Sequence, residues 1–110
     1  MVALHHLPDF WKSVALLKMA EILKTGGKLY LFDVVFIFDP KDHQKAIERM
    51  IKTMRDVAGD SMSDETIIHI KDEFSTYDWI MEGLFEKTGF SIDQKEIEAE
   101  NFISYICSKL

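Results

Sequence analysis

Two groups of residues in this 110-residue sequence have side chains suited to proton chemistry: the pair His5-His6, and Asp33. An imidazole can accept a proton from a nucleophile, although paired histidines close to a chain end are also commonly solvated side chains. Asp33 interrupts the apolar run KLYLFDVVF, and a carboxylate taken out of water is costly unless it has hydrogen bonds. The sequence therefore leaves open whether Asp33 lines a site or has a structural role.

The other histidines and the cysteine favour neither a metal site nor a nucleophile. His43 and His69 fall on separate predicted helices, and no cysteine or carboxylate completes a recognised ligand spacing, so we expect no metal. Cys107 is the single cysteine, which excludes an internal disulfide and is typical of a reducing cytoplasm. We expect the Cys107 thiol to be buried and structural.

The charge pattern argues against nucleic acid as a partner. The formal charge is −6, with +3 on residues 1–55 and −9 on residues 56–110, and no basic stripe is present. The longest apolar stretches, 14–17 and 34–38, are far shorter than the ~20 residues of a spanning helix. We therefore expect no membrane segment, no secretory signal and a cytoplasmic location.

The elements that must position the candidate residues follow from apolar spacing and from helix-start and helix-stop signals. The run 28–36 is rich in β-branched and aromatic residues and predicts a central strand with both faces covered. The predicted helices are 9–24, ending with a left-handed cap at Gly26, then 41–58, 64–74 and 76–88; two further strands are expected at 90–98 and 102–109.

This alternation predicts a single α/β domain over residues 1–110, with a small mixed sheet of about three strands and helices packed on it. The helix 76–88 is best placed to cover a parallel crossover between strands 28–36 and 90–98. The helices within 41–74 are then an insertion at the carboxyl end of the first strand, the side where open α/β sheets bind ligands. Whether this insertion is a lid or a partner surface stays open.

Four blocks carry a resemblance to a known family: ALHHLPDFWK (3–12), LKTGG (23–27), LYLFDVVF (29–36) and EGLFEKTGF (82–90). Their order and spacing resemble the second half of a class I S-adenosylmethionine-dependent methyltransferase, although Thr25 replaces the usual proline of LKPGG. The resemblance implies a partial Rossmann-like fold. In it, the final strand lies antiparallel between the other two, which gives the order first-third-second.

The resemblance also implies roles for the candidate residues. It places His5 and His6 on the loop that faces the transferred methyl group, where an imidazole can accept the proton of the methyl acceptor. Asp33 is a further catalytic candidate on other grounds, because it lies near the carboxyl end of its strand, where α/β sheets bind ligands. It places Ala3, Leu4 and His5 beside the cofactor, S-adenosylmethionine. The methyl acceptor, a small molecule or another substrate, is not revealed by the sequence.

The part of such a domain that holds the cofactor is not in this sequence. The glycine-rich loop and the acidic residue for the ribose lie upstream in the family, and Gly26-Gly27 here end a predicted helix instead of opening one. We therefore expect the chain to be the C-terminal portion of a methyltransferase, binding the cofactor weakly or not at all and inactive without an upstream half. The alternative is a non-catalytic interaction module that forms a homodimer, or pairs with another chain, through its exposed sheet edge.

Overall fold

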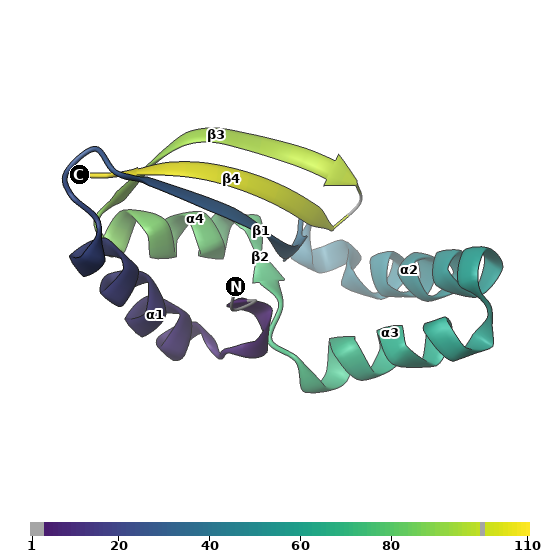
Figure 1. Ribbon diagram of the computed structural model, residues 1–110. Helices are drawn as coiled ribbons and strands as arrows, with labels where there is room; N and C mark the ends of the chain where they lie inside the picture. The colour runs from purple at the N-terminus through teal and green to yellow at the C-terminus, as the bar shows by residue number, and fades with distance from the viewer. Residues whose placement is uncertain (1–3, 100) are drawn as a thin grey trace. The chain divides into compact units, whose positions relative to one another are not determined.

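The computed structural model describes residues 4–99 and 101–110 (Figure 1). The chain divides into two compact units. One contains residues up to Ile37 together with Phe74–Leu110, and the other is Phe38–Glu73. Among the described residues, no helix has both the length and the apolar character needed to cross a membrane.

A four-stranded mixed sheet forms the centre of the first unit (Figure 1). Its strands are β1 (Lys28–Phe36), β2 (Thr76–Tyr77), β3 (Phe90–Ala99) and β4 (Phe102–Lys109), in the order β2-β1-β4-β3. β4 runs antiparallel to both of its neighbours, which confirms the α/β class and the expected order of the three long strands. The expected number of about three strands is too low by one, because β2 adds a parallel pairing at Val35 and Phe36.

Two helices cover one face of this sheet: α1 (Asp9–Ile22) and α4 (Asp78–Lys87) (Figure 1). The core beneath them contains apolar residues from every long element of the unit: Leu4, Leu16, Ala20, Leu31, Val35, Met81, Phe85, Phe90, Ile103, Tyr105 and Cys107. Alternate residues of β1 point the other way, and Tyr30 is 67% exposed and Phe32 52% exposed. The expectation that both faces of β1 are covered is therefore wrong for the described residues.

The helix boundaries differ from the sequence-based ones where local signals compete. α1 ends at Ile22, Leu23 is extended, and Gly26 takes its positive φ of 82° in the turn that follows instead of capping the helix. α4 begins only at Asp78, because Thr76 and Tyr77 belong to β2 and no side chain caps the helix.

The second unit is a helical hairpin. The short 3₁₀ segment η2 (Pro40–Asp42) follows Asp39, whose carboxylate accepts a hydrogen bond of 3.0 Å from the amide of Lys41, as expected of a helix N-cap. α2 (His43–Ala58) and α3 (Asp60–Asp72) pack against each other and are joined by Gly59, with φ at 87°. α3 starts at Asp60, four residues before the predicted start at residue 64.

A group of polar side chains joins α4 to β3 and β4. The ammonium of Lys95 on β3 lies 2.8 Å from Oδ2 of Asp78 and 3.0 Å from Oε2 of Glu82, both on α4. Burial lowers the pKa of Lys95, but the hydrogen bonds and the negative charges of the two carboxylates together outweigh burial, so the net shift of this pKa is upward. The hydroxyl of Tyr105 on β4 donates to the same Oε2 of Glu82, at 3.3 Å. The phenol is thus buried with a partner, as a polar group in a core requires.

Candidate functional site

Asp33 is a buried carboxylate in the second half of β1, on the face that the helices cover. It is 5% exposed, and its neighbours on that face, Leu31 and Val35, belong to the core. Its Oδ1 accepts a hydrogen bond of 2.8 Å from the amide of Val34, and its Oδ2 accepts one of 3.1 Å from the amide of His5. Two backbone donors therefore offset the cost of removing this charge from water.

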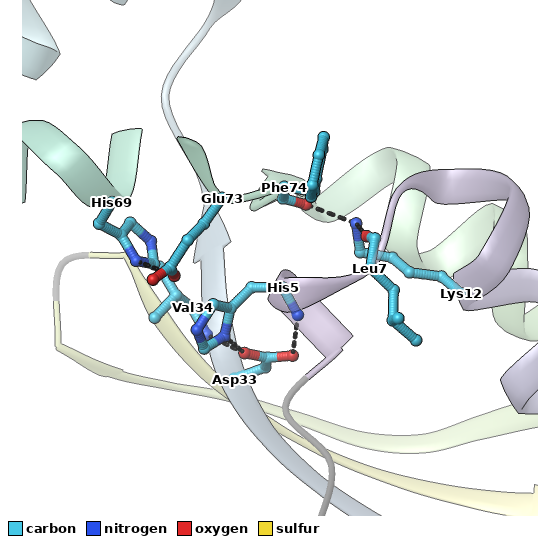
Figure 2. A network of polar contacts seen from close by, with 8 residues as sticks. All are labelled: His5, Leu7, Lys12, Asp33, Val34, His69, Glu73 and Phe74. Carbon is cyan, nitrogen blue, oxygen red and sulfur yellow. Dashed lines mark hydrogen bonds and ion pairs between the residues drawn. The ribbon is translucent and has the colours of Figure 1, made fainter. Parts of the chain in front are cut away.

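The imidazole of His5 completes the surroundings of Asp33. Nδ1 of His5 lies 2.5 Å from Oδ1 of Asp33, and the two side chains are 15% and 3% exposed (Figure 2). A carboxylate beside Nδ1 stabilises the form of the ring whose proton is on Nδ1, and in the neutral ring the lone pair is then on Nε2. A histidine oriented in this way by a buried carboxylate has the arrangement of a general base.

The short 3₁₀ segment η1 (Leu4–His6) holds His5 over β1. The side chain of Leu4 is fully buried in the core and anchors the segment from below. The amide of Leu7 donates to the carbonyl of Leu4 at 2.9 Å, and the amide of Phe74 donates to the carbonyl of His5 at 2.6 Å. His5 is therefore fixed through its side chain, its amide and its carbonyl.

The other residues predicted for the site have different surroundings. His6 is exposed, and its ring centroid lies 4.2 Å from that of His5. Leu4 directs its side chain into the core, so only its backbone could contact a cofactor. Ala3 lies outside the described residues. The structure thus joins His5 to Asp33 and leaves the roles of Ala3, Leu4 and His6 as predictions.

Two buried polar residues near this site were not singled out by sequence reasoning. Lys12 on α1 is 1% exposed, although a lysine on a surface helix normally reaches solvent. Asn101, in the turn between β3 and β4, is 3% exposed, and its carbonyl accepts from the amide of Val35 at 3.0 Å. Its Oδ1 is buried without a hydrogen-bond partner. An asparagine between two strands signals a turn, whereas nothing in the pattern around Lys12 signals burial.

Two further polar side chains are explained by local structure. In the second unit, Nδ1 of His69 on α3 lies 2.5 Å from Oε2 of Glu73, the residue that directly follows the helix (Figure 2). In the first unit, Cys107 is fully buried, as expected, and burial followed by the nearby Asp93 raises the pKa of its thiol to about 11. A thiol in that state is protonated at neutral pH and is a poor nucleophile.

Comparison with known proteins points to one class. Over 90 residues, 82% of this chain, the sequence is 29% identical to an uncharacterized methyltransferase of Bacillus cytotoxicus and 28% identical to one of Bacillus cereus. The match covers 38% of each relative, so the chain corresponds to about two-fifths of their length. No model of a known protein family matches the chain.

A solved structure shares the fold of this chain. It matches the crystal structure of LaPhzM with a TM-score of 0.62 over 97% of this chain and 28% of that chain, at 13% sequence identity, so this likeness concerns the fold alone. The chain resembles the C-terminal half of a methyltransferase, with a partial Rossmann-like sheet. The comparisons thereby confirm the resemblance of the four sequence blocks to the C-terminal half of a methyltransferase.

Proposed function

We propose that this chain is the C-terminal portion of an S-adenosylmethionine-dependent methyltransferase and forms the side of the site that faces the methyl acceptor. The contact between His5 and Asp33 carries this proposal. It lies in the second half of β1, and open α/β sheets bind their ligands at the carboxyl ends of their strands. Without that contact, the resemblance would support the fold alone, because a fold by itself does not show which residues of this chain take part in a reaction.

The chain fits the acceptor side of such a site better than the donor side. A cradle for an adenosyl group uses backbone amides from a glycine-rich turn that opens a helix. Gly26 and Gly27 instead follow the end of α1, and the amide of Gly26 already donates to the carbonyl of Lys109 at 2.8 Å. The described residues therefore hold no donor cradle, and the donor's binding energy would come from an upstream half.

The proposed chemistry of the chain's own residues is proton transfer. S-adenosylmethionine, held by the upstream half, would supply a methyl group activated by a sulfonium. Asp33 holds the proton of His5 on Nδ1, and the imidazole at Nε2 takes the proton that the acceptor loses as it attacks the methyl carbon. Asp33 also stabilises the imidazolium that forms, because the carboxylate stays in contact with Nδ1. Such base catalysis typically contributes ~10²–10⁴ in rate.

An NMR titration tests the donor side of this proposal. S-adenosylmethionine is added to the ¹⁵N-labelled chain alone, and then to a fusion in which the part of the Bacillus cytotoxicus relative preceding the matched segment is joined to this chain. We expect no saturable amide shifts in the chain alone. In the fusion we expect shifts that saturate and that include His5 and Asp33. Saturable binding by the chain alone would contradict the proposal.

A second candidate function, that of an interaction module, is favoured by the uncovered side of the sheet. Phe32 of β1 and Phe102 of β4 stack on that side with ring centroids 5.8 Å apart, and Phe102 is 40% exposed. Among the described residues, β1 has no strand partner along residues 28–34 on the side away from β4. An unpaired strand edge beside exposed aromatic residues is a surface for another chain.

An open groove lies next to that edge. Its volume is about 300 Å³, and it is lined by Met19, Ile22, Leu23, Lys28, Leu29 and Tyr30. We propose that the upstream half, or a second copy of the chain, covers this edge. Sedimentation at micromolar concentration distinguishes the cases: a dimer supports self-association, whereas a monomer that binds the separately expressed upstream part of the relative supports the half-domain. A chain that stays monomeric and does not bind the upstream part of the relative contradicts both occupants proposed for this edge.

A further inference from the structure

The ammonium of Lys12 occupies a buried polar site within the first unit. Its Nζ donates to the carbonyl of Leu7 at 2.6 Å and to the carbonyl of Phe74 (Figure 2). It also lies 3.2 Å from Oδ1 of Asp9. The three protons of the ammonium thus have three acceptors. Two of these are neutral backbone carbonyls, and the carboxylate of Asp9 is half-exposed, so the group is not simply a buried ion pair.

The two carbonyls belong to segments that are far apart in the sequence and both adjoin His5. Leu7 directly follows η1, the segment that carries His5, and Phe74 precedes β2. The peptide groups of Phe74 are held from both sides, because its amide donates to the carbonyl of His5 and its carbonyl accepts from Lys12. Lys12 thereby closes a loop of contacts that runs from α1 through Phe74 to His5.

Burying a charge is expensive, and an apolar side chain such as methionine would fill the same space without that cost. The geometry explains what the charge achieves. A single ammonium can hold two carbonyls at a fixed separation, which a methionine cannot do. Both carbonyls are on the segments that fix the backbone of His5, whose own amide donates to Asp33 at 3.1 Å.

We propose that Lys12 is a positioning residue for the His5–Asp33 pair: it clamps Leu7 to Phe74 and so holds the His5 ring with Nδ1 on Asp33. The proposal rests on the function proposed above for that pair. It deepens that function by naming the residue that keeps the base in its tautomer and orientation. In this proposal Lys12 contacts neither the methyl donor nor the methyl acceptor.

The experiment reads the His5 ring directly, by ¹⁵N NMR of the imidazole nitrogens in the 110-residue chain at neutral pH. In the unsubstituted chain we expect His5 to show a proton on Nδ1. In Lys12→Met we expect the two ring nitrogens to move toward the averaged shifts of a histidine that exchanges between tautomers. The matched control is Lys95→Met, which removes a partly buried lysine of the same unit together with its contacts with α4. It should lower stability without moving the His5 signals.

A Lys12→Met chain with unchanged His5 signals would overturn the proposal, as would equal changes in the Lys95→Met control. If the Lys12→Met variant does not fold, proton exchange in the unsubstituted chain tests the clamp instead. The ammonium protons of Lys12 should then exchange with water far more slowly than the ammonium protons of the exposed Lys18. Exchange as fast as that of Lys18 would refute the clamp.

This readout needs neither donor nor acceptor, so its outcome is separable from the function proposed for the site. The fusion can fail to bind S-adenosylmethionine while Lys12 still controls the His5 ring. Equally, the fusion can bind the donor while the His5 ring is unaffected by Lys12→Met. The first result contradicts the proposed function, and the second contradicts only the positioning role.

Discussion

His5 and Asp33, 28 residues apart in the sequence, meet through two separate contacts: the His5 ring and the His5 amide each bind one oxygen of the same carboxylate. The ring contact sets the tautomer, and the amide contact sets where the ring can lie. Because the amide of His5 itself donates to Asp33, the backbone of His5 is held in place, and fewer rotations of its side chain can move the ring away from Asp33. Asp33 therefore fixes both the tautomer and the orientation of the His5 ring, and a substitution of Asp33 should disturb both.

Asp33→Asn should lower stability as well as disturb the His5 ring. An amide offers only one acceptor oxygen, whereas Asp33 accepts from two backbone amides on different oxygens, so one donor would face an NH₂ group. We expect the free energy of unfolding in urea to fall by about 1–3 kcal/mol. Asp39→Asn is the matched control, since asparagine caps a helix as well as aspartate does. Equal stability of the Asp33→Asn and unsubstituted chains would contradict this account.

Ser63→Ala should stabilise the helical hairpin. Ser63 on α3 is 1% exposed, and its hydroxyl has no hydrogen-bond partner among the described residues, so folding carries the cost of removing that hydroxyl from water. Removing the oxygen should raise the free energy of unfolding by roughly 1 kcal/mol. Ser61→Ala, at an exposed position of the same helix, should change it by less than about 0.5 kcal/mol. A loss of stability in Ser63→Ala would show that the hydroxyl is paired.

Asn101 should tolerate glycine better than alanine. Its φ of 66° lies in the left-handed region, which glycine adopts freely and alanine does not. Asn101→Ala should therefore be less stable than Asn101→Gly by about 1 kcal/mol in thermal or urea unfolding. The two variants remove the same buried amide, so their difference isolates the backbone term. If the Asn101→Ala variant is as stable as the Asn101→Gly variant, residue 101 does not have the left-handed backbone conformation.

The fold should lose stability in alkaline solution. The pKa of the Cys107 thiol is raised to about 11 in the folded chain, and burial also raises the pKa of Tyr105. In the unfolded chain a thiol ionises near pH ~8.5, so above that pH the unfolded state releases a proton that the folded state keeps. The contribution of Cys107 is thus complete below pH ~8.5 and is lost as the pH rises toward about 11. Urea unfolding at several pH values measures it, with Cys107→Ser as the control that removes the thiol. Constant stability over this range would contradict the assigned burial.

Much of the sheet was predictable because its long strands have clear patterns. The run 28–36 has the same bounds in the sequence-based prediction and in the structure, since its apolar, β-branched composition suits no competing element. β2 was missed because two residues, Thr76 and Tyr77, form no alternation, and their strand exists only through pairing with β1. The bare side of β1 was missed for a related reason. A continuous apolar run does not tell whether the elements that cover it are in the same chain.

The site was predictable in its members but not in its contacts. His5 and Asp33 were each chosen for their residue types, whereas the contact between them depends on where η1 crosses β1, which no local pattern encodes. Lys12 was missed because a lysine on an amphipathic helix normally reaches solvent, and here carbonyls of Leu7 and Phe74 replace the water. These contacts are long-range properties of the fold.

The most direct test of the account compares S-adenosylmethionine binding by the isolated 110-residue chain and by the fusion with the upstream part of the Bacillus cytotoxicus relative, with amide shifts at His5 and Asp33 as the readout. The account predicts no saturable binding by the isolated chain. In the fusion it predicts stoichiometric binding that shifts both residues. Stoichiometric binding by the isolated chain, or a donor-loaded fusion in which neither His5 nor Asp33 shifts, would contradict it.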